Sequence, residues 1–163
     1  MATRQIDVQR FSITTSKSFK DFVAGLESRI SHPDLMAFRK NISAARTDSE
    51  LQKIVQAATG SSALMEFTRF DLGEVLRKEL GSRAPQSLRL IVGNPVIMKQ
   101  MVKFVPDAGS YAPVTILVDE RPDGVLISYD EIASFLTSYG NAEALQVAKD
   151  LDFKVETLLT AVS

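Results

Sequence analysis

One apolar stretch, residues 88–92 (LRLIV), constrains what this chain can fold into more than any other part of it. Four of its five residues are apolar, which is typical of a central strand covered on at least one face. Gly93, Asn94 and Pro95 follow at once. Glycine permits a tight turn and proline favours the first turn of a helix, so this motif ends the strand and begins a helix. The sequence therefore predicts a strand–turn–helix unit around which the rest of the chain is arranged.

The segments on either side of this unit alternate between strand and helix patterns. Capping residues such as Asp71, Asp130 and Asn141, and the Asp123-Gly124 turn typical of a hairpin, mark their ends. Strands are expected over 5–14 (with a bulge or a change of buried face at residues 9–10), 64–70, 88–92, 114–118 and 125–129, and helices over 18–30, 33–42, 47–58, 71–80, 95–105, 130–136 and 141–158. This order predicts one α+β domain spanning residues 1–163, with a helical insertion at about 31–60.

Composition argues against several classes of function. Nineteen Lys and Arg stand against 20 Asp and Glu, so a nucleic-acid partner is not expected, because such binding depends on a basic patch. There are no cysteines, which excludes disulfides, thiolate nucleophiles and thiolate metal sites. The apolar runs are only a few residues long, and the first residues lack the apolar core of a signal peptide, so no membrane association and a cytoplasmic location are expected.

An ordered set of motifs from Gly93 onward resembles the family known as domain of unknown function 302 (DUF302). The set comprises the turn at 93–95 after an apolar strand, a helix with Met98 and Met101 that ends near Pro106, Pro113 before a strand that ends in Asp119-Glu120, and Gly124 leading into residues 125–130. The strand and helix over 65–80 also fit, so the likeness covers roughly residues 62 to 158. It implies a curved, mainly antiparallel sheet backed by helices, a topology similar to TATA-binding-protein-like domains, and a homodimer, but no activity.

Two departures from the family pattern bear on catalysis. Family members often carry a histidine where this chain has residues 69–71 (RFD), and another where it has 138–140 (SYG). His32 is the single histidine, and it lies in a turn before Pro33 without an evident set of metal ligands. We therefore predict no catalytic residues, no metal site and no cofactor, and we lean against an enzyme.

The candidate ligand-binding residues are Gly93, Asn94, Pro95, Met98, Glu120 and Tyr129. The turn at 93–95 could present N–H donors to an anion, although a plain tight turn explains it as well. Met98 and Met101 with Phe104, and Phe67, Phe70 and Phe135, could line an apolar cavity or belong to the core. Glu120 or Asp119 with Tyr129 could act as a general acid or base, or serve only hairpin solubility.

Three hypotheses for function follow. The first is a homodimer that binds a small ligand or a protein partner near the turn at 93–95 and the inner face of the hairpin. The second is a cofactor-independent isomerase, lyase or hydrolase that uses Asp119, Glu120, Tyr129 or Asp130 with Asn94 as a hydrogen-bonding anchor. The third is a structural dimer or assembly subunit, which requires a large apolar interface and no pocket.

Overall fold

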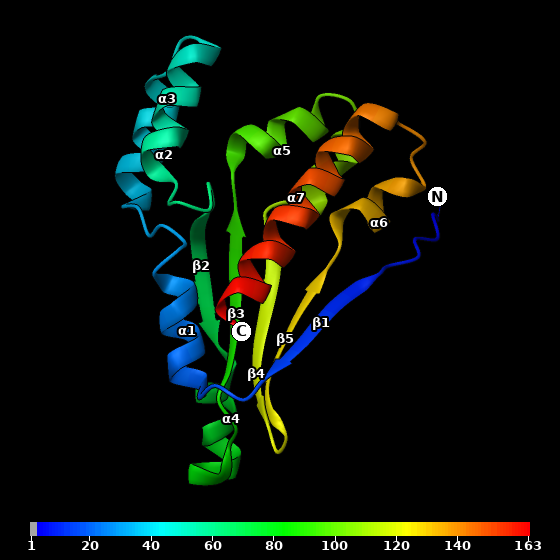
Figure 1. Cartoon of the computed structure of the whole chain (residues 1–163). Coiled ribbons are helices and arrows are strands. Elements are labelled where there is room, and N and C mark those ends of the chain that lie inside the picture. Colours follow the sequence, from blue (N-terminus) through cyan, green and yellow to red (C-terminus); the bar gives the residue numbers. More distant parts are fainter. Residues whose placement is uncertain (1–2) are drawn as a thin grey trace.

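The computed structural model describes residues 3–163, which form one five-stranded sheet with helices on both of its faces (Figure 1). The strands are β1 (Arg10–Thr15), β2 (Met65–Asp71), β3 (Ser87–Gly93), β4 (Val114–Arg121) and β5 (Gly124–Asp130). The helices are α1 (Phe19–Glu27), α2 (Leu35–Ala44), α3 (Asp48–Ala58), α4 (Leu72–Leu80), α5 (Pro95–Val102), α6 (Ile132–Thr137) and α7 (Ala142–Val162), with short 3-10 turns at Gly81–Arg83 and Pro106–Ser110. Strand order is β1-β5-β4-β3-β2, and all neighbours are antiparallel. The predicted α+β class with an antiparallel sheet is confirmed.

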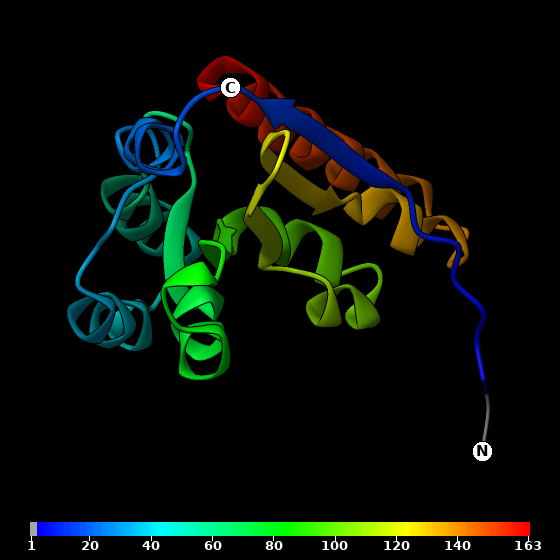
Figure 2. The same cartoon turned by 90° about the horizontal axis from the view of Figure 1, so that it is seen from below.

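The two faces of the sheet differ in what covers them. Along β3, Leu88, Leu90 and Val92 are buried, whereas Arg89 between them is exposed and Ile91 is half-buried. This alternation follows from the period of two along a strand. The buried face packs against α1, α5, α6 and α7, while α4 lies on the opposite side of the curved sheet from α7 (Figures 1 and 2).

Helix α7 is the principal element of the core. Its 21 residues run across the buried face of the sheet, and strands and neighbouring helices bury the side chains on its inward face. The buried positions are Ala144, Ala148, Leu151, Asp152, Val155, Leu158, Leu159 and Val162. The spacing is that of an amphipathic helix, with one carboxylate among the apolar side chains.

The predicted helical insertion is present as the hairpin of α2 and α3, which stands beyond one end of the sheet (Figure 1). Phe38 of α2, Val55 of α3 and Met65 of β2 are buried together in a small separate cluster. The insertion is therefore attached to the sheet through β2.

Three details differ from the sequence prediction. The first strand begins at Arg10, and residues 3–9 lie outside the sheet, although the Glu131 N–H donates to the Gln9 carbonyl at 2.9 Å. The bulge or change of buried face predicted at residues 9–10 therefore corresponds to the beginning of β1 at Arg10. Asp130 does not cap α6, because the N-cap position belongs to Glu131, whose side chain makes no capping bond. Strand β3 is interior, but β4 occupies the middle of the sheet.

The hairpin of β4 and β5 forms as predicted, with Arg121 opposite Gly124. Gly124 adopts a φ of 136°, a conformation that side-chain-bearing residues rarely take. A Cβ at this position would also lie 2.5 Å from the Thr15 carbonyl oxygen of β1. The turn glycine thus permits both the hairpin and the close approach of β1.

Candidate functional site

The strand–turn–helix unit places Asn94 at the start of α5. Its Oδ1 accepts hydrogen bonds from the N–H groups of Val96 at 2.8 Å and Ile97 at 3.3 Å, and its Nδ2 donates to the Ala63 carbonyl at 2.9 Å. Asn94 therefore caps the helix and holds it against the loop before β2. Because the side chain already occupies these two N–H donors, the alternative of an anion bound there is not supported.

A cavity of about 120 Å³ opens beside this turn. Its lining is almost entirely apolar and comprises Phe67, Gly93, Asn94, Pro95, Met98, Ala112, Pro113, Val114 and Leu151. A Cβ on Gly93 would lie 3.0 Å from the Cβ of Pro113, so glycine is what allows the backbone to approach this wall. We call this cavity the turn pocket.

The turn pocket brings together four of the six predicted residues, namely Gly93, Asn94, Pro95 and Met98. The other two lie elsewhere. Glu120 accepts a hydrogen bond from the Gln86 N–H at 2.9 Å, near the hairpin end of β4. Tyr129 is 1% exposed and buried in the core.

The other side chains proposed for an apolar cavity also separate. Phe67 lines the turn pocket, whereas Met101 is fully buried in the main core. Phe104 and Phe70 are 42% and 49% exposed, and Phe135 stacks on Tyr111. Of the side chains proposed for an apolar cavity, only Met98 and Phe67 line the turn pocket beside α5.

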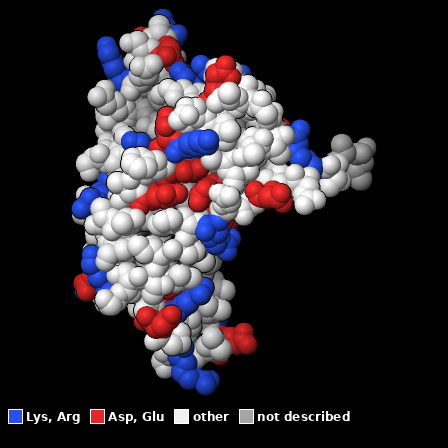
Figure 3. Space-filling view, turned by 45° about the vertical axis from the view of Figure 1, so that its right-hand side comes forward, with Lys and Arg blue, Asp and Glu red and all other residues white. Residues whose placement is uncertain are grey.

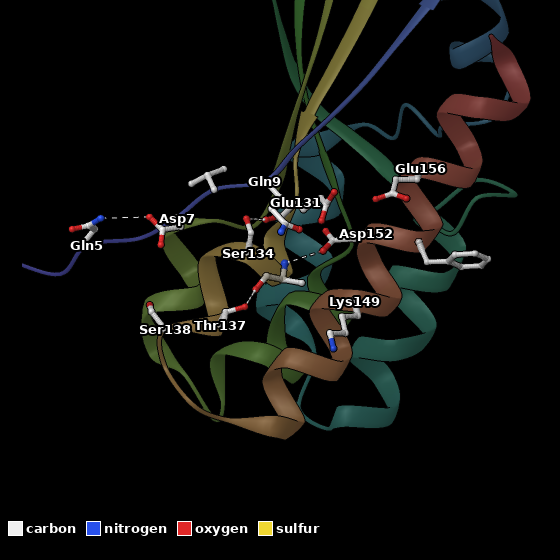
Figure 4. Close-up of a pocket in the computed structure, with 13 residues that line it drawn as sticks. Gln5, Asp7, Gln9, Glu131, Ser134, Thr137, Ser138, Lys149, Asp152 and Glu156 are labelled. Atoms are coloured by element: carbon white, nitrogen blue, oxygen red, sulfur yellow. Dashed lines mark hydrogen bonds between the residues drawn. The ribbon is translucent and has the colours of Figure 1, made fainter.

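A second and larger hollow, of about 700 Å³, lies between residues 5–9, α6 and α7 (Figure 4). Its polar lining includes Asp7, Glu131, Ser134, Thr137, Lys149, Asp152 and Glu156. Figure 3 shows acidic side chains gathered in a band across the middle of this side of the molecule. We call this feature the acidic hollow.

Asp152 forms the floor of the acidic hollow and is 5% exposed. It accepts hydrogen bonds from the N–H groups of Ile132 and Ala133, both at 2.8 Å, and from the hydroxyl of Tyr129. The carboxylate of α7 therefore caps α6 in place of a local side chain and joins α6, α7 and β5.

Burial shifts the acid–base properties of this group and its neighbours. Desolvation raises the pKa of Asp152, and the hydrogen bonds from Tyr129, Ala133 and Ile132 oppose that rise. Desolvation and the charge of Asp152 raise the pKa of Glu131. Desolvation, Glu131 and Asp152 together raise the pKa of Glu156. The hydroxyl of Tyr129 also has a raised pKa, because it is buried beside the same carboxylate.

None of the residues predicted from sequence to bind a ligand lines this hollow. Asp152 stands between Leu151 and Val155 on the inward side of α7, four residues after Ala148. A single carboxylate at an inward position of an amphipathic helix is the feature that could have revealed it, because buried charges need partners. Within residues 3–163 no group of three or more His, Cys, Asp and Glu is placed to hold a metal ion, and no helix is both long and apolar enough to cross a membrane.

The fold and these hollows define a small α+β domain with an antiparallel sheet and a long helix across one face. The family model of domain of unknown function DUF302 matches residues 40–162, and the chain belongs to this family. Among solved structures, it is similar to the crystal structure of an uncharacterized conserved DUF302 protein from Bacillus stearothermophilus, at 12% sequence identity with a TM-score of 0.65. That likeness covers 94% of this chain and 98% of the other. No functionally curated protein matches the chain.

Proposed function

We propose that this protein binds a small ligand whose apolar group occupies the turn pocket. The observation that carries the proposal is that Gly93, Asn94, Pro95 and Met98, singled out from sequence, line one apolar cavity of about 120 Å³. Engineered apolar cavities of roughly 150 Å³ stay dry and bind benzene, so this volume suits a small ring or a short alkyl group. The Asn94 side chain in this lining is engaged by the N-terminus of α5 and the Ala63 carbonyl, so its polar atoms already have partners.

The methionines offer a direct test. The chain holds five methionines, so methyl-labelled protein gives a simple spectrum in which Met98 reports on the pocket and the 76% exposed Met36 serves as an internal control. Titration with benzene is expected to shift the Met98 methyl saturably and to leave Met36 unchanged. Met98→Trp fills the cavity and should weaken benzene binding at least tenfold, whereas Met36→Trp should not. Equal, non-saturating shifts at both methyls would contradict the proposal.

Native mass spectrometry of protein purified from its own host then identifies the natural ligand. A stoichiometric extra mass that leaves on denaturation is expected for wild-type protein and is expected to be absent from Met98→Trp. The same extra mass on both proteins would place the ligand at another site.

A second candidate is a cofactor-independent enzyme, and the acidic hollow is the observation that favours it. A buried carboxylate with a raised pKa at the floor of a large hollow has the properties of a general acid or base. In this candidate Asp152 replaces the carboxylates that sequence analysis suggested. Carbon-detected titration of Asp152 tests it without a known substrate. Titration of Asp152 in the ordinary aspartate range would remove this candidate and leave the turn-pocket proposal untouched.

We also propose that two copies associate through the face of the sheet that carries α4. Phe70, Leu72, Val75, Leu76 and Leu80 are 36–69% exposed there, and we call them the α4 patch. A contiguous exposed patch of large apolar side chains is typical of an interaction surface. A charge placed in this patch is therefore expected to weaken the association.

A further inference from the structure

A third hollow, of about 310 Å³, lies on the outer side of α7, beside the loop between α3 and β2. The residues that matter to its chemistry are Arg29, Ser61, Ser62, Phe153, Lys154 and Thr157. Its volume is at the lower end of the range of roughly 300–1,000 Å³ seen for small-molecule sites. It shares no lining residue with the turn pocket and shares Phe153 with the acidic hollow, and we call this third feature the basic hollow.

Two cations face the basic hollow, which contains one carboxylate, that of Asp150. Arg29 follows α1, and Lys154 lies on α7 with a half-buried side chain. Within residues 3–163 neither forms an ion pair or a side-chain hydrogen bond. Asp150 accepts a hydrogen bond from the Gln146 amide at 2.9 Å and forms no ion pair with either cation, so the two cations outnumber the one carboxylate in the lining. A partly desolvated ammonium beside a guanidinium favours an anionic ligand that would neutralise both.

The loop under these cations is held in place by backbone contacts. The Ser62 hydroxyl donates to the Arg29 carbonyl at 3.0 Å, and the Ser31 N–H donates to the Leu64 carbonyl at 3.2 Å. A Cβ on Gly60 would lie 2.8 Å from the Arg29 carbonyl oxygen, so glycine is needed for the loop to approach this closely. The backbone of Arg29 is therefore held against the loop before any ligand arrives, which reduces the cost of ordering a site.

Hydroxyl donors and an aromatic ring complete the lining. The side chains of Ser61 and Thr157 make no hydrogen bond within residues 3–163, so both can donate to an anion. Phe153 is 72% exposed at the rim, an unusual position for a large aromatic side chain. An exposed ring next to cations provides a stacking surface for a planar ligand.

We propose that the basic hollow binds a phosphate monoester attached to a planar ring, with a nucleoside 5′-monophosphate as the model of this class. Arg29 and Lys154 contact the phosphate, Ser61 and Thr157 donate to its oxygens, and Phe153 stacks on the ring. The guanidinium supplies paired donors that match a phosphate, and the ammonium adds a compact charge. This site is independent of the turn pocket, so either proposal can fail alone.

Calorimetric and NMR titrations of the full chain with AMP and with inorganic phosphate test the proposal. AMP is expected to bind saturably, with amide shifts confined to Arg29 and residues 60–62 and 153–157, and at least tenfold more tightly than inorganic phosphate. Arg29→Gln and Lys154→Gln should each weaken both ligands about tenfold. Phe153→Ser should weaken AMP but leave phosphate unchanged, because it removes the ring contact and no charge.

Lys149→Gln is the matched control, because Lys149 lies on the same helix but borders the acidic hollow. All four side chains are exposed or half-buried, so the variants are expected to fold like the wild-type protein, as circular dichroism can verify. AMP binding that Lys149→Gln weakens as much as Lys154→Gln would overturn the proposal, since it would reflect general charge attraction. Saturable AMP binding with its shifts outside this hollow would overturn it equally.

Discussion

Helices α7 and α4 carry similar apolar stripes but differ in what covers them. Leu151, Val155 and Leu159 of α7 are at most 3% exposed, because the sheet and its neighbouring helices enclose them. Val75 and Leu76 of α4 are 69% and 39% exposed, since α4 lies on the other side of the sheet (Figure 2). Within residues 3–163, α4 packs on a strand and a short turn, whereas α7 packs on three helices.

The difference shows that an amphipathic sequence pattern predicts a helix with one apolar face, but does not predict whether that face is buried within the chain. The apolar surface of α7 is removed from water within the chain and so contributes to folding. The α4 patch remains in water unless another molecule covers it, so its apolar surface is available for association. Substitutions in α7 should therefore act on stability, and substitutions in α4 should act mainly on association.

The largest expected effect comes from shortening the same residue type on each helix. Leu159→Ala removes a fully buried side chain and should lower the free energy of unfolding by about 3 kcal/mol, because a cavity remains. Leu76→Ala removes a side chain that is 39% exposed and should cost about 1 kcal/mol or less. Urea unfolding at one protein concentration measures both. Equal losses would mean that α4 is covered as completely as α7.

The local features of this fold could be predicted from sequence because neighbouring residues determine them. Asn141 and Asp71 cap their helices as expected, and the turn at Gly124 forms the predicted hairpin. The turn pocket could be anticipated only in part. Its near wall belongs to the strand–turn–helix unit, but Leu151 reaches it from α7, far along the chain.

Features that depend on long-range contacts could not be predicted. Residues 5–9 alternate like a strand, yet none of them joins the sheet. Asp130 looked like the cap of α6, but Asp152 accepts those hydrogen bonds from 20 residues away. Tyr129 was expected at a ligand site and is instead buried as a donor to Asp152. In each case the decisive partner comes from another element, and periodicity carries no information about that partner.

A charge in the α4 patch is expected to have an intermediate effect, on association and not on folding, and so tests the contrast between α4 and α7. Val75→Glu places a carboxylate on a side chain that is 69% exposed, so the fold should be little affected. If two copies associate through this patch, desolvating that carboxylate should weaken the dimer at least tenfold. Sedimentation equilibrium measures the shift towards monomer.

Met36→Glu is the control for this prediction. Met36 is 76% exposed on α2, on the insertion and away from the α4 patch, so its substitution should leave the association constant unchanged. A wild-type protein that is monomeric at all accessible concentrations would contradict the proposed dimer. A dimer that resists Val75→Glu would place the interface on another surface.

The smallest effect tests the acidic hollow on the covered side of the molecule. Burial and the charges of Glu131 and Asp152 raise the pKa of Glu156 above its usual value of 4.5, so the folded state binds a proton more tightly than the unfolded state. The stabilisation from that proton is complete below the unfolded-state pKa and is lost as pH rises through the raised pKa of the folded protein.

Glu156→Gln carries no such charge and should avoid the loss. It should therefore raise the melting temperature at pH 7, by an amount corresponding to about 0.5 kcal/mol, and the gain should shrink towards zero near pH 4. Glu79→Gln on α4, which removes the same charge from an exposed position, serves as the control. A gain for Glu156→Gln that is the same at both pH values would show that packing, and not ionisation, is responsible.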